Sequence, residues 1–355
     1  MAIFSSIPTI IITIFIFGLL IFIHELGHYI AARKSGVGII EFAIGMGPKI
    51  YSWEGKVNTF SIRALPIGGF VSMVGEYSED IEEKDKNKVP LEKIPVWKRI
   101  IIALSGPLMN ILLGFFVMLF VVISIDIPST VVAKFDEGSL SSQYGLEEND
   151  EIIEIDGKRT RVYTDMSYKI MADGINPLDI TVLRNGEKVH LNDVQFEVVN
   201  DNGINFGSLD FRVYAKEKSL GNTIHQSFFQ SISIVYMTID QLIDVIGGRY
   251  GVEAVSGPVG IGEQIGEVVK TSEGVGNTVR NLATVVIFIS ISLGIFNLLP
   301  IPVLDGGMIL FAIIELIRRK PLDKKIERSI SAVFMMLLLA LTVVVFFKDI
   351  VRLFN

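Results

Sequence analysis

The chain contains no cysteine, and this absence removes several chemistries at once. Without thiols there is no disulfide framework, no thiolate metal site and no cysteine nucleophile. Histidine is scarce as well, with four residues in 355. Imidazole chemistry must therefore use His24, His28, His190 or His225, and only the first two lie one helical turn apart.

Positive charge is missing from two places where other classes of protein carry it. No basic stripe runs along the sequence, so we expect no nucleic-acid partner. No Lys or Arg precedes the first apolar run and no small-residue cleavage pattern follows it, which is unlike a signal peptide. The net charge of -7 lies mostly between the apolar runs and says little about partners.

Apolar sequence, in contrast, is abundant. Half of the residues are hydrophobic, and the mean hydropathy is +0.51. They collect in four blocks, each close to the ~20 apolar residues that a membrane helix needs. A buried hairpin of a soluble core explains one such block but not four that lack a polar stripe. The sequence predicts a polytopic α-helical membrane protein with four transmembrane helices.

The blocks define the predicted organisation. We assign transmembrane helices to residues 1–32, 100–125, 282–317 and 330–348, the third of them interrupted by prolines. Lys and Arg are concentrated in the loop 33–99 and in the link 318–329, which places both on the cytoplasmic side. Residues 126–281 are then translocated, as a domain at 126–215 and an amphipathic membrane-surface segment at 216–281.

The loop after the first helix alternates apolar and polar residues between Gly and Pro. This pattern predicts membrane-associated β-hairpins that dip towards the bilayer against protein or an aqueous cavity. We expect the hairpin region from Gly45 to Gly75 to offer a strand edge to an extended substrate, with residues 60–63 on that edge. The stretch that follows, residues 77–93, is predicted to be a charged, solvated linker.

The translocated domain has a recognisable order of elements. A strand, a short helix, a second strand and an Asp-Gly turn are followed by a helix and a hairpin with Asn-Gly at its turn. This order resembles the PDZ domains of bacterial envelope proteases and predicts an extracytoplasmic α+β PDZ-like domain. Asn149 stands where that family has a glycine, and no carboxylate-binding loop of the family accompanies it.

The first apolar run ends in His24-Glu-Leu-Gly-His28. Imidazoles at i and i+4 lie on one helical face, about 6 Å apart along the axis, which suits two positions on a tetrahedral zinc ion. Glu25 then reaches a metal-bound water. In a soluble chain, two helix-end imidazoles beside a snorkelling glutamate would be the better interpretation. Inside a span, ionisable groups are costly and normally functional, which favours the metal.

A zinc site with two histidines needs a third protein ligand. Asp305 is the only carboxylate in the third span before Glu315. Pro300 and Pro302 precede it, and Gly306-Gly307 follows it. The alternative is an Asp that caps a kinked helix. We favour the ligand because the predicted topology places Asp305 and the histidines on the same side of the membrane.

The stretches HELGH, FAIGMGPKIYSW, LPIGGFVSMVGE, SGPLMN, SGPVGI and NLLPIPVLDGG together resemble the site-2 protease family, in particular the bacterial regulator-of-sigma-E type. The resemblance covers nearly the whole chain. Two features depart from it: the chain has one PDZ-like domain rather than two, and Met46 replaces an aromatic residue. The resemblance implies zinc ligands at His24, His28 and Asp305 and a catalytic base at Glu25.

The same resemblance implies substrate-binding roles for Asn297, Pro300 and Asn110, with a helix–helix hydrogen bond as the alternative for the two asparagines. It implies a zinc-dependent intramembrane endopeptidase of the bacterial inner membrane, with its active site near the cytoplasmic side. The expected substrate is the transmembrane segment of a single-span protein already trimmed by another protease, such as an anti-sigma factor.

Two other classes of function compete with this interpretation. A non-catalytic PDZ-type membrane receptor or scaffold would have helices that serve only as anchors. A transporter would use buried His and Asp as a proton relay, but the internal repeats typical of transporters are not visible in the sequence.

Overall fold

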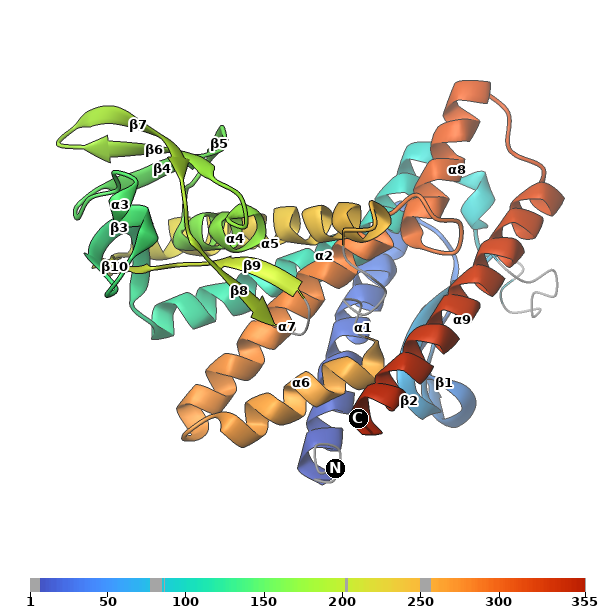
Figure 1. Ribbon diagram of the computed structural model, residues 1–355. Coiled ribbons are helices and arrows are strands. Elements are labelled where there is room, and N and C mark those ends of the chain that lie inside the picture. Colours follow the sequence, from blue (N-terminus) through green and yellow to red (C-terminus); the bar gives the residue numbers. More distant parts are fainter. Residues whose placement is uncertain (1–6, 77–84, 86, 202–203, 250–256, 355) are drawn as a thin grey trace. The chain divides into compact units, whose positions relative to one another are not determined.

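The computed structural model describes residues 7–76, 85, 87–201, 204–249 and 257–354 (Figure 1). Parts of the predicted first helix, of the charged linker and of the segment 216–281 therefore lie outside the described residues. The chain forms two compact units, Met1–Gly114 with Gly251–Asn355 (unit 1) and Phe115–Tyr250 (unit 2). Helix α2 (Val96–Ser124) is continuous through the boundary between them.

Five helices within the described residues are long and apolar enough to cross a membrane, as expected for an integral membrane protein. Four of them fall on the predicted spans: α1 (Ile7–Ser35), α2, α7 (Val275–Asn297) and α9 (Lys324–Phe354). The fifth is α5 (Leu220–Ile246), the least apolar of the set, which lies in the segment predicted to be amphipathic and at the membrane surface.

The third predicted span consists of two helices. Helix α7 ends at Asn297, and α8 (Asp305–Arg318) begins eight positions later. Pro300 and Pro302 have no backbone N–H to continue α7. Val303 has φ of 115°, a value that few non-glycine residues adopt. At Gly306 a Cβ would collide with the carbonyl oxygens of the α7–α8 link, so only glycine lets the chain turn this tightly.

Unit 1 contains one small sheet, built from β1 (Ile39–Glu54) and β2 (Thr59–Met73). Both strands are long and fold back, so that each contributes two segments. Residues 41–44 of β1 pair with 69–72 on one side and with 59–62 on the other, while 51–54 pair with 59–62. The prediction of an edge at residues 60–63 is therefore wrong for 60–62, which have neighbours on both sides. The outer segments are 51–54 and 69–73.

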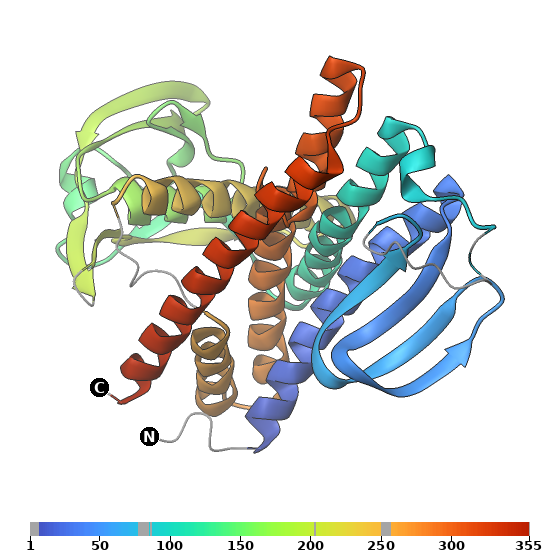
Figure 2. The same ribbon diagram turned by 90° about the vertical axis from the view of Figure 1, so that its right-hand side faces the viewer.

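The sheet packs along α1, as Figure 2 shows. Their shared core also receives residues from the short helix η2 (Leu91–Lys93) and from α2. Its buried members are Ala31, Ala32, Val37, Ile39, Phe42, Val71, Met73, Leu91, Ile94 and Ile102. This packing holds β2 against the helix that carries the two neighbouring histidines.

One carboxylate is buried within the sheet. Glu41 accepts hydrogen bonds from Ser61 and from Arg63 Nη2 at 2.8 Å, and Lys49 Nζ lies 3.0 Å from it. Burial alone would raise the pKa of Glu41, but these hydrogen bonds and the charge of Lys49 outweigh burial and lower the pKa. Glu41 thus ties three segments of the sheet together.

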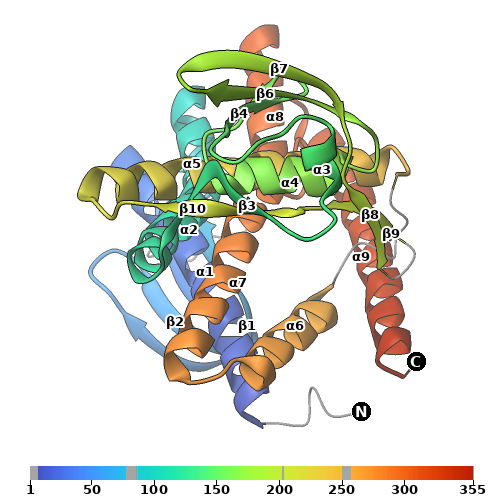
Figure 3. The same ribbon diagram turned by 60° about the vertical axis from the view of Figure 1, so that its left-hand side comes forward.

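Unit 2 is built on a six-stranded antiparallel sheet with the order β10-β3-β4-β6-β7, in which β5 pairs with β4 (Figure 3). The elements are β3 (Ile127–Phe135), α3 (Leu140–Gln143), β4 (Glu151–Ile155), β5 (Lys158–Arg159), α4 (Tyr163–Asp173), β6 (Leu178–Arg184), β7 (Glu187–Val194) and β10 (Phe211–Lys216), with a separate hairpin of β8 (Glu197–Asp201) and β9 (Ile204–Ser208). Helix α4 contributes Met166 and Ile170 to the core. The order of elements matches the one read from the sequence.

The stretch around Asn149 has a clear structural role. Asn149 has φ of 73°, a left-handed conformation that asparagine tolerates better than most residues other than glycine. Asp150, which follows, is completely buried and accepts two hydrogen bonds from Arg184, both 2.7 Å long. This bidentate pair fixes the loop before β4 to the end of β6.

The segment 216–281 contains α5 in unit 2, and α6 (Pro258–Thr271) and the start of α7 in unit 1. Helix α6 packs against α1, α7 and α9. Buried Asp349 of α9 accepts hydrogen bonds from Gly257 N at 3.0 Å and Gly260 N at 2.9 Å. These bonds satisfy free N–H groups at the first turn of α6 and connect it to the last helix.

Candidate metal centre

His24 and His28 lie on one face of α1, and the N-terminus of α8 brings Asp305 to them. The two Nε2 atoms are 3.2 Å apart. Asp305 Oδ2 is 3.0 Å from His24 Nε2, and Oδ1 is 3.3 Å from His28 Nε2. Ligands held ~2.0–2.1 Å from a tetrahedral zinc ion lie about 3.3 Å from one another. The three side chains predicted as ligands therefore converge at the spacing that zinc requires.

The hydrogen bond at Nδ1 of His28 is consistent with a metal ligand. His28 Nδ1 is 2.8 Å from the carbonyl oxygen of Ile102, which can only accept, so Nδ1 carries the proton. In the neutral form with its proton on Nδ1, His28 has the lone pair of Nε2 on the side of the Asp305 carboxylate. Asp305 Oδ2 is buried and has no hydrogen-bond partner among the described residues. Two imidazole nitrogens and a carboxylate at this spacing are a donor set that suits zinc.

Helix α2 leaves space for the imidazoles. A Cβ at Gly106 would collide with His28 Nε2 and would lie 2.9 Å from His24 Cε1. A Cβ at Gly27 of α1 would likewise collide with the backbone of Ser105. Glycine at both positions lets α1 and α2 approach closely enough for α2 to contact the histidines.

Glu25 lies beside the cluster but is not one of its three ligand candidates. Its neighbour is the outer segment of β2. A Cβ at Gly69 would lie 3.3 Å from Glu25 Cγ, and the backbone N–H of Val71 faces the carboxylate. Glu25 is therefore placed between the ligand cluster and a strand segment whose other side is paired with β1.

The three residues expected to bind substrate lie in different surroundings. Asn297 ends α7, and its Nδ2 donates to Leu293 O of the same helix at 2.9 Å. Pro300 is exposed in the α7–α8 link. Asn110, in contrast, is completely buried, and its Nδ2 is 3.3 Å from His24 Nδ1. Only Asn110 contacts the histidine cluster.

The sequence pointed to Asn110 as a substrate contact, but it did not point to Ile102 and Gly106 of the same helix, α2. Ile102, Gly106 and Asn110 are spaced at i, i+4 and i+8, which places them on one face of the helix. That spacing was visible in the sequence, but an apolar span offers many such triplets. The role of Ile102 belongs to its backbone oxygen, so its side chain gave no signal.

The other two histidines lie in unit 2 and have ordinary neighbours. His190 Nδ1 is 3.0 Å from Thr181 Oγ1, and His225 packs against the ring of Phe229. Within the part of the chain that the structure describes, His24, His28 and Asp305 form the single group able to hold a metal ion.

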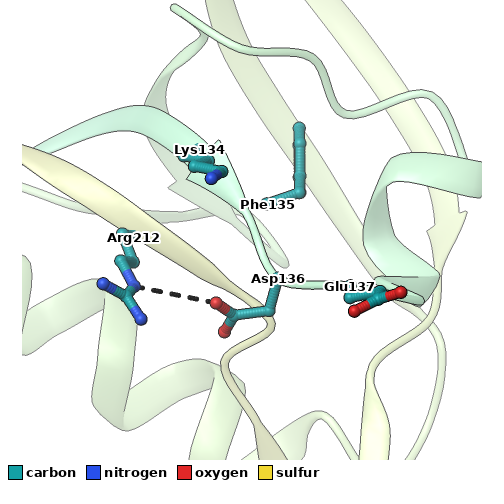
Figure 4. Close-up of a pocket in the computed structure, with 5 residues that line it drawn as sticks. All are labelled: Lys134, Phe135, Asp136, Glu137 and Arg212. Atoms are coloured by element: carbon teal, nitrogen blue, oxygen red, sulfur yellow. Dashed lines mark ion pairs between the residues drawn. The ribbon is translucent and has the colours of Figure 1, made fainter.

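A pocket of unit 2, shown in Figure 4, has a different character. Its volume is about 320 Å³, and it is lined by Lys134, Phe135, Asp136, Glu137 and Arg212. Arg212 Nε is 3.7 Å from Asp136 Oδ1. The charges of its two basic and two acidic residues offset each other, and its lining contains no histidine.

The family model that describes peptidase family M50 matches residues 12–341. The chain belongs to this family. A putative zinc metalloprotease of Fusobacterium nucleatum is 33% identical over 98% of this chain and 100% of its own length. The regulator of sigma-W protease RasP of Bacillus subtilis is 29% identical over 98% of this chain and 99% of its own length. A putative zinc metalloprotease of Clostridium perfringens is 32% identical over 96% of this chain.

These matches confirm the resemblance to site-2 proteases, because they extend over nearly the whole chain. The protein is a zinc metalloprotease of the membrane, and zinc is its cofactor. The non-catalytic receptor is disfavoured.

Proposed function

We propose that this membrane protease hydrolyses a peptide bond within the transmembrane segment of single-span proteins, with His24, His28 and Asp305 as its zinc ligands. The convergence of two imidazole nitrogens and one carboxylate at 3.0 to 3.3 Å carries the proposal. The proposed ligands come from α1 and from the start of α8, so the site lies in unit 1 of the chain.

Glu25 is the general base and acid. Zinc, when bound, makes a water molecule more acidic and stabilises negative charge on the carbonyl oxygen of the substrate. Glu25 takes a proton from the attacking water and later gives it to the leaving amine. The water oxygen becomes part of the new carboxyl group, and the peptide C–N bond breaks.

The substrate must be extended at the cut, because a helix keeps its carbonyl groups in i to i−4 hydrogen bonds. The segment 69–73 of β2 pairs with β1 on one side only, and Val71 N–H faces Glu25. An unwound substrate adds to this edge as a further strand. We expect Asn297 and Pro300 to contact the same unwound stretch from the end of α7.

Strand addition predicts an alternating requirement for substrate N–H groups. Only every second N–H of an added strand points at its neighbour. N-methylation of a substrate peptide should therefore raise KM strongly at every second position and weakly between them. An equal effect at all positions contradicts pairing with an edge.

The active site faces the cytoplasmic side of the bacterial inner membrane, and residues 126–215 form an extracytoplasmic PDZ-like domain that acts as a gate. The distribution of Lys and Arg and the order of elements in unit 2 support this arrangement. The gate excludes substrates whose outer domain has not been removed by another protease. Anti-sigma factors are the candidate class, since one relative is named a regulator of sigma-W.

Replacing residues 127–215 by a short linker tests the gate. The shortened protein should cleave untrimmed substrates that the full chain rejects. Unchanged selectivity contradicts a role as gate.

Cleavage itself is tested by co-expressing a tagged single-span protein with the wild type or with Glu25→Gln. A fragment formed only with the wild type is expected. A fragment formed equally with Glu25→Gln would exclude Glu25 as the base, and no fragment from any trimmed single-span substrate would favour the receptor.

A further inference from the structure

Asn110 has an unusual hydrogen-bonding environment. Its side chain is completely buried, yet its Oδ1 has no hydrogen-bond partner among the described residues. Its Nδ2, a donor only, is 3.3 Å from His24 Nδ1. A buried amide oxygen without a hydrogen-bond partner destabilises the state in which it occurs. The unpaired oxygen therefore indicates a partner that this side chain acquires in another state of the site.

The state of His24 identifies that partner. His24 Nε2 is the nitrogen that faces His28 and Asp305. A neutral imidazole that binds a metal through Nε2 carries its proton on Nδ1, which then needs an acceptor. Half a turn of the Asn110 carboxamide exchanges Nδ2 and Oδ1. This one rotation gives His24 Nδ1–H an acceptor and gives Oδ1 a partner.

His28 provides an internal comparison, because its acceptor is already in place. The carbonyl oxygen of Ile102 lies 2.8 Å from His28 Nδ1. Ile102 and Asn110 are two helical turns apart on the same face of α2, with Gly106 between them. One face of α2 thus offers an acceptor to each histidine and the space in which both imidazoles fit.

The backbone of Asn110 is itself anchored. Its carbonyl oxygen accepts a hydrogen bond of 2.7 Å from Ser290 Oγ of α7. A Cβ at Gly294 would lie 2.8 Å from Pro107 O, so α7 packs closely along this part of α2. The close packing holds the carboxamide next to His24.

We propose that Asn110 is a positioning residue, whose carboxamide oxygen accepts the Nδ1–H hydrogen bond of His24 and fixes the imidazole in the orientation that binds zinc. This role replaces the substrate contact expected from the sequence. It rests on the zinc site of the proposed function but on no assumption about the substrate.

Zinc affinity of the full-length protein, measured by competition with a chelator, tests the proposal. Asn110→Leu keeps the approximate size and removes the acceptor, and it should weaken zinc binding about 10- to 100-fold. Asn110→Asp keeps an acceptor oxygen and should bind zinc at least as tightly as the wild type. Asn297→Leu is the matched control: its amide bonds within its own helix, and its loss should leave zinc affinity unchanged.

Cobalt in place of zinc supplies a second measurement. The visible absorption bands of bound cobalt should shift in Asn110→Leu and stay close to those of the wild type in Asn110→Asp. Wild-type zinc affinity in Asn110→Leu, with only KM raised, would make Asn110 a substrate contact and overturn the proposal.

Equal weakening of zinc affinity in Asn110→Asp and Asn110→Leu would overturn the proposal as well. If the Leu variant is unstable without metal, the zinc affinity of the Asp variant alone decides. A wild type that binds no zinc would contradict the ligand set in the proposed function, a result distinct from these.

Discussion

Two carboxylates, one in each unit, have opposite surroundings. In unit 2, Asp150 accepts two hydrogen bonds from the guanidinium of Arg184. In unit 1, Asp305 faces the Nε2 atoms of His24 and His28, and its Oδ2 has no hydrogen-bond partner among the described residues. The cationic partner of Asp150 is Arg184 of the same chain, whereas Asp305 is placed to bind a metal ion from solution together with the two histidines. Asp150 stabilises the fold, and in the proposed function Asp305 binds the zinc ion.

Removing the two carboxylates one at a time should have different effects on the zinc content of the protein. Asp305→Ala deprives zinc of one of three protein ligands, so bound zinc and cleavage should both be lost. Asp150→Ala should leave the zinc content at one ion per chain. Metal analysis of the purified proteins measures both. Loss of zinc from Asp150→Ala, or its retention by Asp305→Ala, would contradict the division of roles.

The space around the histidines is the next most sensitive feature. Gly106→Ala places a methyl group against both imidazoles and should reduce zinc binding and cleavage at least tenfold, because the cluster cannot keep its spacing. Gly18→Ala is the matched control in α1, where an added Cβ meets nothing within 4 Å. Similar zinc affinities for the two variants would show that the close approach of α2 is unnecessary.

The pair in unit 2 should show its effect in stability. Asp150→Ala removes both hydrogen bonds between the carboxylate and Arg184, which keeps Glu147 and Gly145 O as partners. Hydrogen bonds to charged groups contribute about 1.5–3 kcal/mol, so we expect a loss of stability of that size. Amide exchange in β4 and β6 should accelerate accordingly, while exchange in α1 stays unchanged. Unaltered exchange in unit 2 would mean that the pair contributes little to the fold.

The smallest expected effect concerns Glu41, a carboxylate whose cations are Arg63 and Lys49. Its pKa in the folded protein lies below the ordinary value of 4.5. Its contribution to stability is therefore complete above pH ~4.5 and is lost as the pH falls through the lower folded value. Amide exchange in β1 should rise over that acidic range. Glu41→Gln should remove this part of the pH dependence, and an unchanged profile in that variant would assign it to other groups.

The sequence was most informative where the signal is local. Spacing of i and i+4 was enough to predict that His24 and His28 share a helical face, and the two prolines near Asp305 predicted the break before α8. The order of strands and helices in unit 2 also followed from short patterns, such as the Asn-Gly turn between β6 and β7, whose residues have φ of 53° and 86°.

What the sequence did not reveal depends on contacts between distant segments. Asn110 and His24 are 86 positions apart, and Ser290 bonds to Asn110 across 180 positions. The fold-back of β1 and β2 hides the segment expected to be an edge, because alternation along a strand does not specify its neighbours.

Zinc K-edge X-ray absorption of the purified wild type tests the ligand set most directly. The account predicts one zinc per chain, with two imidazole nitrogens and carboxylate or water oxygens at about 2.0–2.1 Å and no sulfur. A spectrum with one imidazole or none, or with a shell of oxygens alone, would contradict it.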